Sequence, residues 1–107
     1  MTYDDQNIFA RIIRGELPAI KVYEDNRVLA FMDIMPQAEG HTLVIPKFPA
    51  VTLLDLDPAE AAYTIQIVQN VAKAMEKALD VKGIVLMQLS GTSAGQTVPH
   101  VHFHLIP

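Results

Sequence analysis

Three histidines near the end of the sequence alternate with apolar residues: His100, His102 and His104. β-branched and aromatic neighbours with a period of two are typical of a strand, on which alternate side chains point to the same face. Near neutral pH, imidazole can serve as a nucleophile, a general acid or base, or a metal ligand. We therefore predict a row of three imidazoles on one face of a strand, while the other face packs a core through Val101, Phe103 and Leu105.

A loop of small and polar residues, 91–97, directly precedes the histidines. Glycine lets backbone amides approach an anion, and threonine and glutamine add hydrogen-bond donors. Together with the imidazoles, this loop indicates a site for an anionic substrate that is attacked at phosphorus. The loop also matches the hydrolase pattern G-x-S-x-G around Ser93, but that pattern requires a turn into a helix within a large α/β sheet, and here a strand follows. We therefore do not expect Ser93 to be a nucleophile.

The same residues allow other interpretations. A His-x-His-x-His strand could bind zinc, although no carboxylate lies in the strand or its loop. His41 begins another predicted strand and, taken alone, is more simply structural. Asp33 could be a turn residue or a carboxylate that binds two sugar hydroxyls. A set of apolar residues could form either the core or a pocket for a nucleotide base, namely Phe9, Ile12, Leu17, Phe31 and Ile34.

The elements that position these residues follow from hydrophobic spacing and turn signals. We predict a helix over residues 7–14, ended by Gly15, and a hairpin of strands 20–23 and 28–33. A third strand covers residues 41–46. Strands 83–89 and 98–106 complete the set.

A long helix is predicted between the third and fourth strands. Asp57 suits an N-cap, Pro58 the first helical position, and Glu60 a capping box. The helix should continue to residue 79, with an apolar face at spacings of three and four, comprising Ile65, Val68, Ala72, Met75 and Leu79. Short connections between consecutive strands favour antiparallel pairing. The fold class is therefore α+β: two helices against a mostly antiparallel, five-stranded sheet, in one domain spanning residues 1–107.

Composition argues against several classes of function. The chain has 8 basic and 12 acidic residues, a net charge of −4 and no basic run, which argues against nucleic acid as a partner. Without cysteine it has no disulfide and no thiolate metal site. No apolar run approaches the roughly 20 residues that cross a bilayer, and the acidic N-terminus is unlike a signal peptide, so we expect a cytoplasmic protein with no membrane partner. Because Pro107 directly follows the histidine strand, we expect further C-terminal residues in the natural chain.

Taken together, these residues resemble the histidine triad (HIT) family, in particular its nucleotide-binding hydrolases. The family motif, His-x-His-x-His followed by two apolar residues, matches residues 100–106, and the segment before the triad matches residues 94–98. Residues 8–13, 31–37 and 40–47 match further family segments in the same order. The resemblance therefore covers nearly the whole chain.

This resemblance implies a homodimer whose two sheets join into one of ten strands, with a purine nucleotide held by its α-phosphate at the triad. His102 would be the nucleophile that forms a covalent nucleotidyl-histidine, which water then hydrolyses. His100 would orient the nucleophile, and His104 would contact the phosphate, where its protonated form would offset developing charge. His41 would be the fourth histidine of the site, and Thr97 would supply a hydroxyl near the leaving group. No cofactor and no metal is expected.

The resemblance also assigns the nucleotide contacts. Asp33 would bind the ribose hydroxyls, and the apolar set named above would surround the base. The phosphate would be bound by the Gln96 side chain and by the backbone amides of residues 95–98, which include Gly95, Thr97 and Val98.

The chain departs from the family pattern in three places. Many members have Asn or Gln just before the glycine loop, where this chain has Leu89 and Ser90, so a phosphate contact of Ser90 is in doubt. The printed sequence stops at Pro107, before the C-terminal segment that shapes substrate preference in relatives. Some bacterial members hold a structural zinc partly through cysteine, which this chain lacks.

The function expected from the sequence is a nucleotide hydrolase or nucleotidyl transferase that acts on purine nucleoside phosphoramidates or dinucleoside polyphosphates. Two alternatives stay open: a non-catalytic nucleotide-binding or scaffold protein, and a metal-dependent hydrolase.

Overall fold

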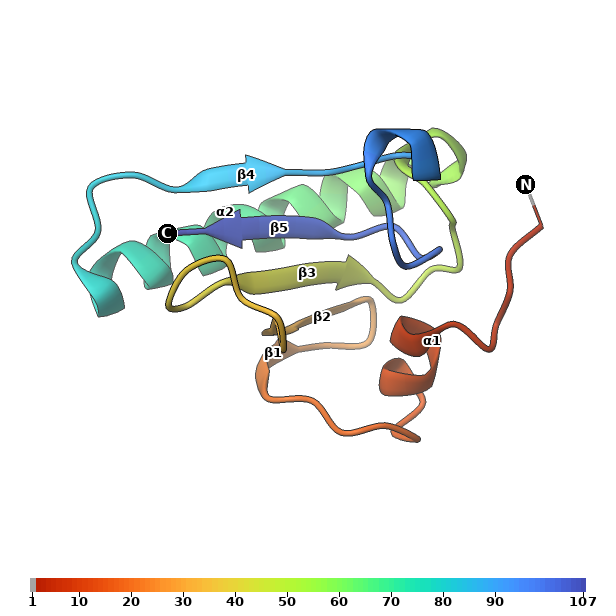
Figure 1. Cartoon of the computed structure of the whole chain (residues 1–107), viewed down its shortest axis with the longest axis horizontal. Coiled ribbons are helices and arrows are strands. Elements are labelled where there is room, and N and C mark those ends of the chain that lie inside the picture. Colours follow the sequence, from red (N-terminus) through yellow and green to blue (C-terminus); the bar gives the residue numbers. More distant parts are fainter. Residues whose placement is uncertain (1) are drawn as a thin grey trace.

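Five strands form one sheet in the order β1-β2-β3-β5-β4 in the computed structural model, which describes residues 2–107. Every neighbouring pair is antiparallel, so the predicted α+β class is confirmed and the sheet is more regular than predicted. β5 lies between β3 and β4, which places the last strand of the chain inside the sheet (Figure 1). The strands are β1 (Lys21–Glu24), β2 (Val28–Met32), β3 (Thr42–Pro46), β4 (Val85–Met87) and β5 (Phe103–Ile106).

The long helix α2 (Pro58–Leu79) covers one face of the sheet (Figure 1). It begins as predicted, because the Asp57 carboxylate accepts hydrogen bonds from two first-turn amides. Glu60 does not complete a capping box, since its carboxylate pairs with Arg27 at 3.1 Å. The buried face is centred differently from the prediction: Ile65 and Leu79 are 45% and 37% exposed. The residues that pack on the sheet are Thr64, Ile67, Val68, Val71 and Met75.

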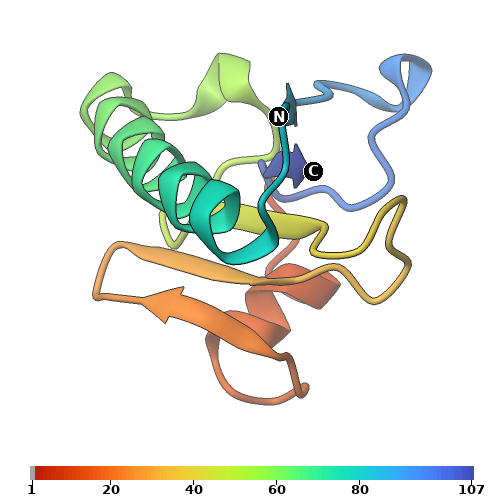
Figure 2. The same ribbon diagram turned by 90° about the vertical axis from the view of Figure 1, so that its left-hand side faces the viewer.

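The short helix α1 (Ile8–Ile13) lies on the other face of the sheet (Figure 2). Asn7 caps it, accepting a hydrogen bond from the Ala10 amide at 2.9 Å. Phe9 and Ile12 pack on the sheet residues that point away from α2, which are Leu29, Phe31, Leu43 and Ile45. The two helices therefore bury opposite faces of the same strands.

The segment before β5 differs from the prediction. β5 begins at Phe103 rather than at residue 98, so His100 and His102 precede the strand. The amide of Val101 donates to the carbonyl of Ala50 at 2.9 Å, so this segment follows the loop after β3. The predicted alternation nevertheless holds, because Val101, Phe103 and Leu105 all lie in the core under α2.

Smaller differences affect the connections. β4 is shorter than predicted, and two single-turn helices, η1 (Leu53–Asp55) and η2 (Thr92–Ala94), were not anticipated. Among the described residues, no helix combines the length and apolar character needed to cross a membrane.

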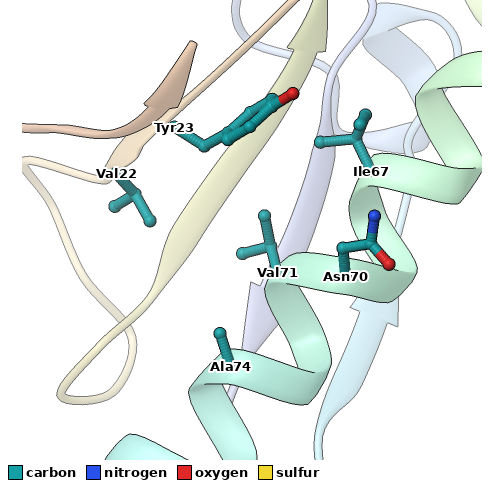
Figure 3. Close-up of a pocket in the computed structure, with 6 residues that line it drawn as sticks. All are labelled: Val22, Tyr23, Ile67, Asn70, Val71 and Ala74. Carbon is teal, nitrogen blue, oxygen red and sulfur yellow. The ribbon is translucent and has the colours of Figure 1, made fainter.

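An apolar pocket of about 190 Å³ opens between β1 and α2 (Figure 3). Its wall combines Val22 and Tyr23 of β1 with Ile67, Val71 and Ala74 of α2. It lies on the α2 face of the sheet, whereas the histidines face α1. This pocket is therefore separate from the candidate site.

Candidate active site

Two of the three alternating histidines lie together on the α1 face of the sheet. The ring centroids of His102 and His104 are 5.0 Å apart. Phe9 of α1 meets the His102 ring edge-on, with 4.9 Å between centroids and 90° between planes. The predicted row is therefore formed by His102 and His104, with α1 packed beside it.

His102 has one nitrogen engaged and one free. Its Nδ1 lies 2.6 Å from the backbone oxygen of His100. A carbonyl oxygen only accepts, so Nδ1 carries the proton and Nε2 carries a lone pair. Every buried polar side-chain atom among the described residues has a hydrogen-bond partner, and no bond engages Nε2, so Nε2 reaches solvent. Burial lowers the pKa of His102, which favours this neutral, nucleophilic form.

His104 and His41 form a relay of hydrogen bonds that starts at the backbone of Gln37. The Gln37 amide donates to Nδ1 of His41 at 3.0 Å, so the proton of His41 is on Nε2. That nitrogen lies 2.9 Å from Nδ1 of His104, which must accept, so the proton of His104 is on Nε2. Burial lowers the pKa of His104 to about 4, and the neighbouring imidazoles of His102 and His41 further disfavour a charge on this ring. The relay therefore offers a neutral His104 that donates from Nε2.

His100 lies apart from this pair and is fully buried. Its Nε2 lies 2.7 Å from the backbone oxygen of Pro46, and its Nδ1 lies 2.5 Å from the hydroxyl of Tyr3. Burial lowers its pKa to about 4. Both ring nitrogens are occupied within the chain, so His100 acts on the site through its backbone oxygen. No pattern in the sequence pointed to Tyr3, because it lies 97 positions from its partner.

The glycine loop is held closed by the side chain of Gln96. Its Oε1 accepts from the Gly91 amide at 2.8 Å, and its Nε2 donates to the carbonyls of Val51 and Val98 at 2.6 and 2.9 Å. Gly91 and Gly95 have φ angles of 97° and 102°, a region that strongly favours glycine. The Gln96 side chain therefore braces the loop and has no hydrogen-bond donor left for a phosphate.

Two backbone amides of this loop are available to an anion. The amides of Gly95 and Gln96 donate to carbonyls within the loop. Over residues 2–107 no hydrogen bond engages the amides of Thr97 and Val98, and the Thr97 hydroxyl is also free. Ser93 lies exposed in η2, and no helix follows η2. The G-x-S-x-G match around Ser93 therefore does not mark a hydrolase nucleophile here.

Asp33 shows features of both of its predicted roles. Its Oδ1 accepts from the Met35 amide at 2.9 Å, as a turn residue would. Its Oδ2 lies 3.4 Å from Nε2 of His41. The carboxylate therefore lies at the site, and its contact with a ribose stays a prediction.

A metal ion fits this donor set poorly. Ligand atoms of Asp33, His41 and His104 lie within 4.8 Å of one another. However, the Gln37 amide points at Nδ1 of His41, which keeps the proton on the nitrogen that would have to bind the ion. A cation here would have to remove that proton and separate the two rings. The donor set favours a proton relay over a metal centre.

The predicted apolar set separates into two groups. Phe9, Ile12 and Phe31 are buried, and Leu17 packs partly buried against them. Ile34 is 89% exposed, so its interpretation as a core residue is wrong: it follows the end of β2, in the turn formed at Asp33. An exposed isoleucine beside Asp33 remains compatible with contact to a base.

The Ser90 hydroxyl is engaged in hydrogen bonds within the chain. Its hydroxyl donates to Oε1 of Gln88 at 2.9 Å and accepts from the Leu53 amide at 3.3 Å. The Leu89 side chain lies against Gly95, where it is 3.3 Å from the position of an added Cβ. These two residues therefore contact the groups around the loop, and a phosphate contact of Ser90 stays a prediction.

Comparisons with known proteins agree with this geometry. The HIT domain family model matches residues 14–107. A crystal structure of a HIT-like protein from Bartonella henselae is 53% identical, with a TM-score of 0.98, over 100% of this chain and 80% of that one. Adenosine 5′-monophosphoramidase HNT1 of Saccharomyces cerevisiae is 42% identical over 99% of this chain and 65% of its own length. Adenylylsulfatase HINT3 of Arabidopsis thaliana is 37% identical over 99% of this chain and 54% of its own length.

The family match covers far more than half of the chain, and the similarity extends through the loop, the histidines and the whole sheet. The protein therefore belongs to the HIT family.

Proposed function

We propose that this protein is a nucleotidyl hydrolase that cleaves purine nucleoside 5′-phosphoramidates through a covalent nucleotidyl-histidine. The observation that carries the proposal is the state of His102, whose Nδ1–H is bound to a carbonyl and whose Nε2 has no hydrogen-bond partner among the described residues. Two relatives support the class of reaction, since one is named an adenosine monophosphoramidase and the other an adenylylsulfatase. Both names describe an adenylyl group with a different leaving group.

In the first step, Nε2 of His102 attacks the α-phosphorus and the bond from phosphorus to the leaving amine breaks. The amine takes up a proton, for which the free Thr97 hydroxyl is the candidate donor. The substituted ring becomes cationic, and the carbonyl of His100, 2.6 Å from Nδ1, stabilises that charge.

In the second step, water attacks phosphorus and the bond to Nε2 breaks. Water returns one proton to the Thr97 oxygen, the nucleoside monophosphate leaves, and His102 is neutral again. One difficult displacement thus becomes two easier ones. An anionic phosphate next to His104 raises the pKa of that ring. The Nε2–H of His104 can therefore bind the phosphate as a charged donor after the substrate arrives.

The nucleotide contacts follow from the groups that the chain leaves free. The amides of Thr97 and Val98 would bind the phosphate, since those of Gly95 and Gln96 donate within the loop. Oδ2 of Asp33 would accept from the ribose hydroxyls. The exposed side chain of Ile34 would cover the base.

A homodimer forms part of the proposal. The free edges of the sheet are β1 and β4. β1 is bulged and carries charged pairs, features that discourage edge pairing. β4 exposes Val85 and Leu86, at 56% and 51%, and is the edge at which a ten-stranded sheet would form. Light scattering after gel filtration would give twice the mass of the chain, and a single-chain mass would refute the dimer.

The reaction is tested with His102→Ala on adenosine 5′-phosphoramidate. We expect an intact fold by circular dichroism and a loss of turnover equivalent to several kcal/mol of barrier, because covalent catalysis is removed. Retained turnover would exclude His102 as the nucleophile. A panel with diadenosine polyphosphates and adenylyl sulfate would rank the leaving groups.

The two alternatives are tested on the wild-type protein. Incubation with an α-phosphate-labelled substrate and acid quenching should trap label on the chain, whereas a non-catalytic nucleotide-binding protein would remain unlabelled. Chelation should leave the rate unchanged. Loss of activity on chelation, restored by a divalent cation, would instead establish the metal-dependent hydrolase.

A further inference from the structure

Tyr3 is a long-range partner of the histidine segment. Its hydroxyl lies 2.5 Å from Nδ1 of His100, and the two rings meet edge-on with 5.6 Å between centroids. The other nitrogen of His100 donates to the Pro46 carbonyl, so Nδ1 has only a lone pair to offer. Tyr3 is therefore the donor in this bond, and it fixes His100 in a single neutral tautomer.

The backbone of His100 passes this constraint to the proposed nucleophile. The same residue that Tyr3 and Pro46 hold by its ring supplies the carbonyl that accepts from Nδ1 of His102 at 2.6 Å. Because both nitrogens of the His100 ring are anchored, the residue as a whole is restrained. If His100 shifted enough to break the bond from its carbonyl to Nδ1 of His102, the proton of His102 could move to Nε2, which would remove the nucleophilic lone pair.

The segment that carries Tyr3 is firmly attached to α1. The carbonyl of Asp4 accepts both from the amide of Asn7 at 3.2 Å and from its side-chain Nδ2 at 2.7 Å. The carbonyl of Asp5 accepts from Arg14 at 2.7 Å. Since α1 also places Phe9 against His102, one N-terminal unit contacts two of the three histidines.

We propose that Tyr3 is a positioning residue, which holds His100 so that its backbone carbonyl keeps His102 protonated on Nδ1 and nucleophilic at Nε2. This inference rests on the proposed function, in which His102 attacks phosphorus. Tyr3 itself does not touch the substrate. Its hydroxyl acts through one buried ring and one peptide group.

The test is Tyr3→Phe, which removes the hydroxyl and keeps the ring. The matched control is Tyr23→Phe, which removes a hydroxyl that donates to Asp25 at 2.8 Å and belongs to a residue lining the pocket on the α2 face. On adenosine 5′-phosphoramidate we expect kcat of Tyr3→Phe to fall about threefold to tenfold, the rate equivalent of one hydrogen bond, with KM unchanged. Tyr23→Phe should leave both constants unchanged.

A second readout does not depend on activity. Nitrogen-15 NMR of labelled histidines distinguishes a protonated ring nitrogen from a bare one. In the wild type we expect His102 to be protonated on Nδ1 and His100 on Nε2, and in Tyr3→Phe we expect a fraction of His102 to carry its proton on Nε2. The Tyr23→Phe spectrum should match the wild type.

The two readouts separate the possible failures. If Tyr3→Phe leaves both kcat and the His102 nitrogen shifts unchanged, the positioning role is refuted and the hydroxyl only packs. If wild-type protein turns over no nucleotide while the tautomer still changes in Tyr3→Phe, the proposed function fails and the structural link from Tyr3 to His102 stands. Equal melting temperatures for the two variants would show that the effect does not arise from general destabilisation.

Discussion

Gln96 supports the loop that we assign to phosphate binding, and its replacement tests the site in two ways. The side chain is only 6% exposed and makes three hydrogen bonds to backbone groups. Gln96→Ala removes all three and leaves partly buried backbone groups without these partners. With about 1 kcal/mol for each bond, and more where a buried group stays unsatisfied, we expect the free energy of unfolding to fall by about 2–4 kcal/mol.

The assay is urea denaturation followed by circular dichroism, with Gln6→Ala as the control. Gln6 is an exposed glutamine whose side chain bonds only to Asp5, so its replacement should change stability by less than about 0.5 kcal/mol. Gln96→Glu is a second variant of nearly the same shape. It keeps an acceptor for the Gly91 amide but turns an oxygen toward the carbonyls that Gln96 now donates to, so it should destabilise the protein as well.

Gln96→Ala should also affect substrate binding more than the chemical step. Thr97 and Val98 directly follow Gln96, and their free amides depend on the closed loop. We expect Gln96→Ala to raise KM for adenosine 5′-phosphoramidate about fivefold to tenfold, with a smaller loss of kcat. If Gln96→Ala were as stable as Gln6→Ala, the assigned hydrogen bonds would be wrong. If stability fell but KM did not rise, the loop would not be the phosphate site.

Three further outcomes follow from the structure. Burial holds the pKa of His100 at about 4, below its usual 6.5, so the unfolded chain takes up a proton first as the pH falls. In urea titrations, the free energy of unfolding should therefore drop by about 1 kcal/mol from this group between about pH 7 and about pH 5.5. A flat profile would contradict the burial of His100. Asp25→Asn replaces a carboxylate that accepts hydrogen bonds from two tyrosine hydroxyls and two backbone amides. The free energy of unfolding should fall by about 2 kcal/mol while kcat stays unchanged, and a loss of kcat would link this cluster to the site. Ile34→Ser should leave the melting temperature unchanged, because the side chain is 89% exposed, and should raise KM, whereas an unchanged KM would remove it from the base contacts.

Local patterns predicted much of the fold. Asp57 and Pro58 marked the start of α2 because capping is a property of a few neighbouring residues. The period of two between residues 101 and 105 correctly separated core residues from histidines, since a strand places alternate side chains on opposite faces. The same local rules failed for the face of α2. Which apolar stripe is buried depends on the sheet that it meets, and the sequence alone does not show that surface.

The sequence by itself determined which residues could do chemistry, the antiparallel α+β class and the side of the last strand on which His102 and His104 lie. Only the tertiary structure decided what each histidine can do. β3 pairs with β5, which is distant in sequence, and this pairing brings His41 to His104. The N-terminal segment places Tyr3 on His100. Proton positions depend on such long-range hydrogen bonds and on burial, because each ring nitrogen takes its role from the partner that it meets. Residue spacing predicts the face of the sheet to which a side chain points, but it does not predict which distant residue packs against each of its atoms.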